Sequence, residues 1–154
     1  MDFEWDILKR ALVAILLSGI LGWEREAAGK SAGVRTHMLM GLAATLFVVI
    51  SELMIQRFQH DDQQLRYDPI RVLEAVVTGV SFLGAGTIFL SDSKDRVKGL
   101  TTAASILVTA AVGMMVGLRF YLLACAITLM IFIVLHGLAW LKDRIARKRP
   151  TPEP

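Results

Sequence analysis

Residues 100–118, LTTAASILVTAAVGMMVGL, decide what kind of fold this chain adopts. The stretch holds 19 residues without one charged side chain. At about 1.5 Å of rise per residue, a helix of this length crosses roughly 30 Å, the thickness of the hydrocarbon core of a bilayer. The stretch therefore predicts a transmembrane helix.

Four further apolar runs of similar length accompany it, at residues 7–23, 38–55, 70–90 and 120–141. The 154-residue chain is 55% hydrophobic, with a mean hydropathy of +0.55, which exceeds what a soluble domain shows. We predict an all-α, polytopic membrane protein. Residues 1–141 form a compact bundle of five transmembrane helices, and residues 142–154 form a basic, disordered cytoplasmic tail.

The first run is the weakest of the five. Lys9 and Arg10 lie in its first turn, so their side chains must extend toward water. A signal peptide is the alternative, but acidic residues precede the run and GWERE follows it in place of a small-residue cleavage site. We expect this helix to be retained.

Positive charge predicts the orientation of the bundle. Eleven of the 17 Lys and Arg residues fall on the side that holds the C-terminus, and cytoplasmic loops are enriched in these residues. We therefore place the N-terminus outside and the C-terminus in the cytoplasm. The net charge of +3 is explained by this topology, so we predict no nucleic-acid binding.

Two connections on the predicted cytoplasmic side concentrate charge. They are GWEREAAGKSAGVRTH at residues 22–37 and SDSKDRVKGLTT at residues 91–102. We predict that the second connection and the basic tail contact anionic lipid. The two connections together form a surface that engages a membrane-protein partner or responds to ions, with Glu24 and Arg25 pairing with charges of the second connection. The charged residues of this surface include Glu24, Arg25, Lys30, Arg35 and Lys98.

The third run opens with a helix start signal. Asp68 is placed to cap the helix, and Pro69 suits its first position. Arg71 lies three residues from both Asp68 and Glu74, so these three side chains can meet on one face. We interpret them as an outer mouth cluster, which is either an interfacial ion pair or a gate.

Small and polar residues mark the predicted packing faces. Thr102, Ser105, Thr109 and Gly113 share one face of the fourth run, and the third run, with Thr78, is its candidate partner. The Gly113-x-x-x-Gly117 pair serves either internal packing or a homo-oligomer. The packing or crevice residues are Gly79, Ser81, Gly84, Gly86, Ser105, Thr109, Gly113 and Gly117.

Acidic residues fall at the ends of the predicted spans, so we predict no metal site, no cofactor and no catalytic residue. Gly79-Val80-Ser81 with His136 faintly resembles an intramembrane serine protease. At 1.5 Å per residue the two side chains differ in depth by about 8 Å, which is too far for a nucleophile and its base. We interpret His136 as an interfacial or packing residue and expect a protein that is not an enzyme.

Three functions stay open. The first is a regulator that acts through the charged surface on the cytoplasmic side. The second is a conduit for Mg²⁺ or another small cation, and the third is a structural, lipid-organising bundle. The conduit would be lined by Thr78, Ser81, Thr102, Ser105 and Thr109.

GWEREAAGKSAGVRTH, DPIRVLEAVVTGVSFLGAG and RVKGLTTAAS, in this order and spacing, resemble the three signature blocks of the MgtC/SapB membrane family over nearly the whole chain. The resemblance implies a bacterial inner-membrane protein linked to magnesium limitation, acid tolerance and survival inside macrophages. It implies action by regulation, including restraint of the proton-translocating ATP synthase, more than by magnesium transport.

The family pattern also implies functional positions in this chain. They are Glu24, Arg25, Arg35 and Thr36 in the first block, Asp68, Arg71, Gly79, Gly84 and Gly86 in the second, and Gly99, Leu100, Thr101 and Thr102 in the third. Virulence-associated members carry a soluble C-terminal domain after the bundle. We expect this chain to be a short form without that domain.

Overall fold

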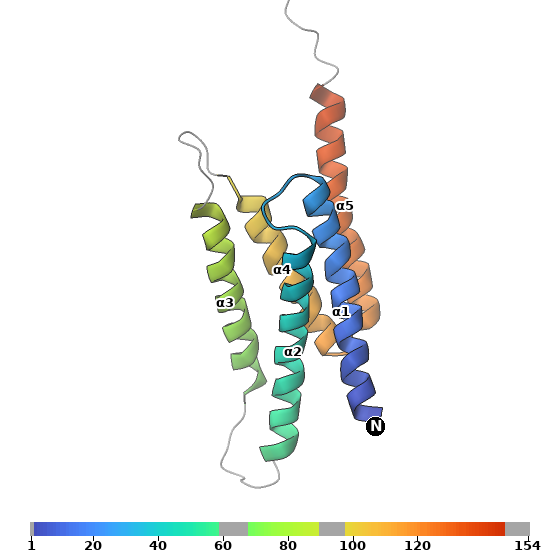
Figure 1. The fold of residues 1–154 in the computed structure, drawn as a ribbon, viewed down its shortest axis with the longest axis vertical. Coiled ribbons are helices and arrows are strands. Elements are labelled where there is room, and N and C mark those ends of the chain that lie inside the picture. The colour runs from blue at the N-terminus through green and yellow to red at the C-terminus, as the bar shows by residue number, and fades with distance from the viewer. Residues whose placement is uncertain (1, 59–67, 90–97, 147–154) are drawn as a thin grey trace, which may run out of the picture.

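A computed structural model describes residues 2–58, 68–89 and 98–146, and these residues form five α-helices. Consecutive helices run in opposite directions along one axis (Figure 1). The prediction of an all-helical chain is confirmed. The bounds are α1 Asp2–Ala27, α2 Val34–Phe58, α3 Pro69–Phe89, α4 Leu100–Gly117 and α5 Tyr121–Ala146.

The predicted tail falls partly on α5. This helix continues to Ala146, so residues 142–146 are helical rather than disordered. Residues 147–154 of the tail lie outside the described part of the chain.

The start of α3 is capped as predicted. The Oδ1 atom of Asp68 accepts a hydrogen bond from the backbone N–H of Ile70 at 3.0 Å. This bond satisfies one of the N–H groups that a helix start leaves without a partner inside the helix.

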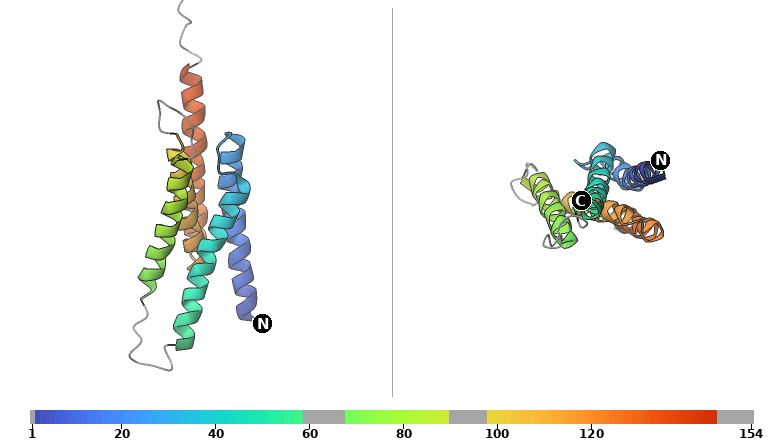
Figure 2. Two further views of the ribbon diagram at one scale, coloured as in Figure 1. Left: turned by 60° about the vertical axis from the view of Figure 1, so that its left-hand side comes forward. Right: turned by 90° about the horizontal axis from the view of Figure 1, so that it is seen from below.

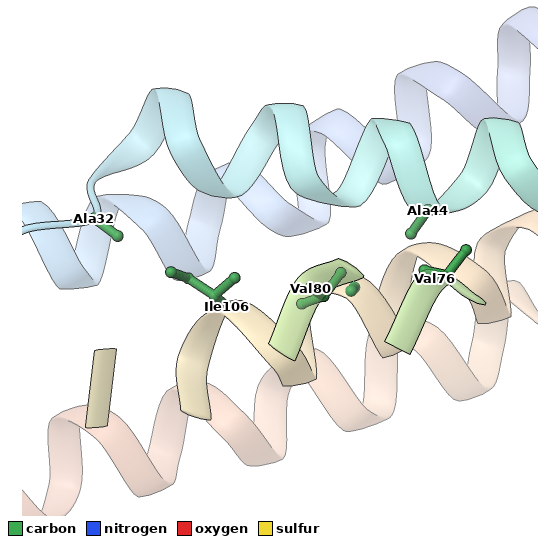
Figure 3. Close-up of a cluster of buried hydrophobic side chains, with 6 residues drawn as sticks. Ala32, Ala44, Val76, Val80 and Ile106 are labelled. Carbon is green, nitrogen blue, oxygen red and sulfur yellow. The ribbon is translucent and has the colours of Figure 1, made fainter. Parts of the chain in front are cut away.

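Helix α4 contacts each of the other four helices and forms the centre of the bundle, which the views of Figure 2 show from two further sides. Two groups of buried apolar side chains surround it. One joins α2, α3 and α4 and is drawn in Figure 3. The other joins α1, α4 and α5 and consists of Ala14, Leu17, Val112, Val116 and Ala124.

The polar stripe of α4 packs on α2. A Cβ atom on Gly113 would collide with the carbonyl oxygen of Gly41, and one on Gly117 would lie 2.8 Å from Cβ of Val48. Thr45 donates a hydrogen bond to the carbonyl oxygen of Gly113 at 2.7 Å. The Gly113-x-x-x-Gly117 pair therefore serves internal packing, because these two backbones approach too closely for any larger residue.

The expectation that α3 is the partner of this stripe is wrong. Helix α3 does contact α4, but at Gly84, where an added Cβ atom would lie 3.4 Å from Cβ of Ala103. Gly79 and Gly86 have no atom within 4 Å of an added Cβ, so neither lies in a helix contact. Ser81 and Thr78 are exposed on α3. Periodicity shows which residues share a face but not which helix covers it.

The outside of the bundle is strongly apolar. Leu122 is 86% exposed and Phe82 is 80% exposed, and many other large apolar side chains face outward with them. Monomeric soluble proteins rarely expose apolar patches of this extent, whereas a lipid-facing surface requires them.

Three of the helices are long and apolar enough to cross a membrane. The spans are Val34–Arg57 in α2, Ile70–Ile88 in α3 and Leu100–Gly117 in α4, and a shorter apolar helix, Tyr121–Gly137, lies in α5. By length and composition, α2, α3 and α4 are therefore candidate membrane spans, as predicted. The crossing of a membrane by all five helices, and their orientation, stay predictions.

Candidate functional site

The connection between α1 and α2 folds back over the start of α2. Gly29 has a φ of 65°, in the left-handed region that glycine adopts without strain, and it turns the chain after α1. The Oε2 atom of Glu26 accepts a hydrogen bond from the backbone N–H of Val34 at 2.9 Å. Glu26 thus satisfies an N–H group in the first turn of α2, a role that was not predicted from the sequence.

A pocket of about 870 Å³, lined by both polar and apolar side chains, opens where this connection meets the end of α3 and the start of α4. We call it the basin. The pocket is lined by Lys30 and Lys98, two of the charged residues predicted for the cytoplasmic surface, and by positions that the family pattern implies: Thr36, Gly99, Leu100, Thr101 and Thr102. Ser31 and Thr87 add two further hydroxyl groups. Residues of the first and third motif blocks, far apart in the chain, therefore form one site.

The basin carries positive charge. Among its described lining residues, the charged side chains are Lys30 and Lys98, and both are exposed. Helix α4 starts there behind Gly99, whose φ is 90°, and no side chain of the described residues caps this helix start. The free N–H groups of a helix start add partial positive charge. The site is thus suited to negatively charged groups.

A buried ion pair lies beside the basin end of α1. The Nε atom of Arg25 donates to Oε2 of Glu24 at 2.5 Å, and these side chains are only 3% and 4% exposed. The two residues therefore bond to each other. Residues 90–97 of the second connection, with which they were expected to pair, lie outside the described residues. Arg35, by contrast, is exposed on α2.

His37, which the sequence places in the first charged connection, lies on α2 and is fully buried near the basin. Its Nδ1 atom donates to the carbonyl oxygen of Gly33 at 2.9 Å, which leaves Nε2 as the acceptor in the neutral ring. The Ser105 hydroxyl lies 3.2 Å from this Nε2 and 2.8 Å from the carbonyl oxygen of Thr102. Its single proton can serve either acceptor, so Ser105 links α2 to the first turns of α4.

A second charged cluster, at the opposite end of the bundle, was not predicted. Arg10 is fully buried and donates to Glu52 at 2.6 Å and to Asp6. Arg119, in the turn between α4 and α5, bonds to the same acids, at 3.0 Å to Asp6 and 2.8 Å to Glu52. We call these four residues the turn-end network. Two guanidinium groups thus share two carboxylates from α1 and α2.

The expectation that Arg10 extends toward water is therefore wrong. Its guanidinium finds acceptors inside the bundle, including the carbonyl oxygen of Gly117 at 2.9 Å. A buried charge is tolerated when opposite charges and hydrogen bonds surround it. The one sequence signal was the i, i+4 spacing of Asp6 and Arg10, which places the two side chains on one face of α1.

The hydrogen bond from Arg10 lowers the pKa of the Asp6 carboxyl below its ordinary value, and the bond from Arg119 acts in the same direction. A carboxylate whose pKa is lowered by folding stabilises the protein above its unfolded pKa, about 4. That stability is lost as the pH falls through the lower, folded pKa. Asp6→Asn should therefore flatten the pH dependence of the melting temperature below about pH 4, in detergent, relative to the unchanged chain.

An equal loss of melting temperature on acidification in both proteins would contradict this role of Asp6. Glu4→Gln is the matched control, since Glu4 is an exposed acid on the same helix. It should leave the pH profile unchanged.

The predicted outer mouth cluster is looser than the turn-end network. Nε of Arg71 lies 4.0 Å from Oδ2 of Asp68, and Arg71 is 84% exposed. Glu74 is exposed as well. An exposed pair at this distance contributes little stability.

The two residues of the protease alternative, Ser81 and His136, do not lie together in the structure. Ser81 is exposed on α3, and His136 is exposed on α5, where it stacks on Phe132 with ring centroids 5.7 Å apart. Helices α3 and α5 make no contact over their described residues. Within those residues, the structure also contains no group of three or more His, Cys, Asp and Glu side chains placed to hold a metal ion.

Known proteins with similar sequences cover most of this chain. "Putative magnesium transporter YhiD" of Escherichia coli K12 is 38% identical over 143 residues, which are 93% of this chain and 65% of that protein. Protein SapB of Bacillus subtilis is 34% identical over 94% of this chain and 61% of its own length. Protein MgtC of Brucella abortus (strain 2308) is 40% identical over 68% of this chain and 39% of its own length.

The chain thus spans less than two thirds of the length of each of these relatives. No solved structure matches it. The MgtC family model matches residues 11–144, which include α2, α3 and α4, most of α1 and α5, and every residue that lines the basin. This match agrees with the three motif blocks, and the chain belongs to the MgtC family.

Proposed function

We propose that this chain is a non-enzymatic regulatory protein of the bacterial inner membrane, which acts on a membrane partner through its basin. The observation that carries the proposal is the basin itself, because it gathers Lys30, Thr36, Lys98, Gly99, Thr101 and Thr102 from two separate motif blocks. A pocket with hydroxyl groups and two exposed lysines is a surface that an acidic partner recognises. Magnesium limitation, acid and intracellular stress are the conditions under which we expect it to act.

The polar stripe of α4 supports a regulator more than a conduit. Thr109 donates to the carbonyl oxygen of Ser105 at 2.7 Å, and Thr45 donates to that of Gly113. Both hydroxyl groups donate to backbone carbonyl oxygens within the closely packed contact between α2 and α4. Thr78 and Ser81, by contrast, are exposed on α3. The five hydroxyl groups expected to line one conduit therefore do not line one path: those of Thr102, Ser105 and Thr109 are buried on α4, and those of Thr78 and Ser81 are on the exposed surface of α3.

The proposal includes five membrane crossings, with the basin in the cytoplasm and the turn-end network outside. In a background without Cys125, we expect a membrane-impermeant maleimide to label Gln56→Cys on intact cells and Lys30→Cys only after permeabilisation. Both positions are exposed and lie at opposite ends of the bundle, at the end of α2 and in the basin. Labelling of position 30 on intact cells would reverse the orientation.

Charge reversal in the basin tests the regulatory role. The double variant Lys30→Glu, Lys98→Glu should reduce growth in low magnesium to the level of a strain that lacks the protein, because a basic surface then repels its acidic partner. Both side chains are exposed, so the abundance of the protein in the membrane should stay within about twofold. Lys9→Glu, an exposed lysine at the other end, is the control and should grow normally.

Photocrosslinkers at positions 30 and 101 should capture the partner, for which the ATP synthase is our first candidate. Normal growth of the reversed variant, together with no crosslinked membrane protein, would contradict the proposal.

Cation transport is the second candidate, favoured by the name of the Escherichia coli relative. Magnesium flux through the purified chain in liposomes, above that of empty liposomes, would select it over the regulator.

A further inference from the structure

An apolar groove of about 820 Å³ runs between α2 and α3. Ala44, Val76 and Val80, which lie close together in Figure 3, form part of its lining. Its walls include Leu39, Phe47 and Leu83, all of which are more than half exposed. Gly79 widens it, since an added Cβ atom there meets nothing within 4 Å.

The groove and the basin are continuous. Thr36, Met40 and Leu83 line both. One surface thus changes from apolar, along the length of α2 and α3, to polar and positively charged at the start of α4. Arg35 lines the groove near this junction, one residue before Thr36.

The two parts suit the two parts of a phospholipid. An acyl chain requires an apolar channel along the membrane-spanning helices, which the groove supplies. A phosphate group requires cations and donors, and the basin has Lys30, Lys98, hydroxyl groups and the start of α4, whose N-cap residue is a glycine. Each volume lies within the roughly 300–1,000 Å³ of ordinary ligand sites.

We infer that the chain binds one anionic phospholipid, with its headgroup phosphate in the basin at Lys30 and Lys98 and an acyl chain in the groove between α2 and α3. A free phosphate would bind in the basin but would not occupy the apolar groove. A second helix would fill the groove but leave the lysines without a charge partner. The inference deepens the proposed function, since the lipid would occupy the same basin.

The test is competition between lipids for the purified chain. The protein is equilibrated in micelles with equimolar phosphatidylglycerol and phosphatidylcholine, and retained lipid is counted by native mass spectrometry. We expect one phosphatidylglycerol per chain, retained at least fivefold over phosphatidylcholine. Equal retention of the two lipids would overturn the headgroup assignment.

Two variant pairs locate the lipid. Lys30→Gln with Lys98→Gln should remove the preference for phosphatidylglycerol, whereas Lys9→Gln should keep it. Gly79→Phe should reduce retention of both lipids at least fivefold, whereas Ser81→Phe, which adds the same group to an exposed position outside the groove, should not. Melting temperatures in detergent show that each variant is folded.

Unchanged phosphatidylglycerol retention in Gly79→Phe would overturn the groove assignment. Displacement of the lipid by millimolar inorganic phosphate would assign the basin to a soluble anion, and a co-purifying protein that Gly79→Phe releases would assign the groove to a partner helix. Either result overturns the inference. Lipid retention is measured on the isolated protein, so a failure here is distinct from a failure of the growth test.

Discussion

Replacing Arg10 by methionine is expected to lower the free energy of unfolding by about 1.5–3 kcal/mol, because two carboxylates and a carbonyl oxygen lose a charged hydrogen-bond donor. The change leaves the carboxylates of Asp6 and Glu52 with Arg119 alone. It also removes the donor to the Gly117 carbonyl oxygen. Methionine keeps much of the side-chain length, so the loss reports mainly on charge and hydrogen bonds. Reversible unfolding in detergent, followed by circular dichroism, measures it.

Two variants act as controls for this experiment. Lys9→Met removes an exposed neighbour that lies over the Tyr121 ring, 5.4 Å from its centroid, and should cost less than about 1 kcal/mol. Glu52→Gln added to Arg10→Met restores a balance of one acid and one guanidinium, so the double variant should be more stable than Arg10→Met alone. An Arg10→Met protein as stable as Lys9→Met would contradict the turn-end network.

Gly113→Ala should destabilise the bundle by about 2–3 kcal/mol, since the added methyl group meets backbone rather than a movable side chain. The carbonyl oxygen of Gly41 lies in its path. Helices α2 and α4 must then separate, which also weakens the hydrogen bond from Thr45 to Gly113. The melting temperature in detergent should fall, and protease sensitivity of the chain should rise.

Gly86→Ala is the matched control, because it makes the same change in α3, where an added Cβ atom has no neighbour within 4 Å. Alanine is the better helix former, so this variant should gain up to about 1 kcal/mol. The two substitutions therefore have opposite expected signs. A stabilising Gly113→Ala would show that α2 and α4 do not touch at this point.

The helices and their caps could be predicted because they depend on short stretches of chain. The uncharged run at 100–118 and the Asp68 cap each need only neighbouring residues, and both were found where expected. From the sequence, the motif residues could be predicted only to lie on the same side of the membrane. Their convergence on one pocket required the positions of three helices and a loop.

The turn-end network shows why the rest could not be predicted. Asp6 and Arg10 are four residues apart, but Glu52 is 42 residues from Arg10, and Arg119 is 113 residues from Asp6. Nothing local in the sequence links these distant residues. From the sequence, the Arg10 side chain was therefore expected to extend out of an apolar helix toward water. The structure shows that partners from α2 and from the turn between α4 and α5 lie beside it.

From its residues alone, this protein could be recognised as a set of apolar helices with most charges near their ends, because helix formation and hydrophobicity depend on nearby residues and their spacing. Which faces meet became known from the arrangement of the helices: the stripe of α4 packs on α2, Arg10 is buried, and a groove joins the basin. All the helices are apolar, so hydrophobicity does not select partners among them. Close backbone approach at glycine and a few long-range polar contacts make that choice.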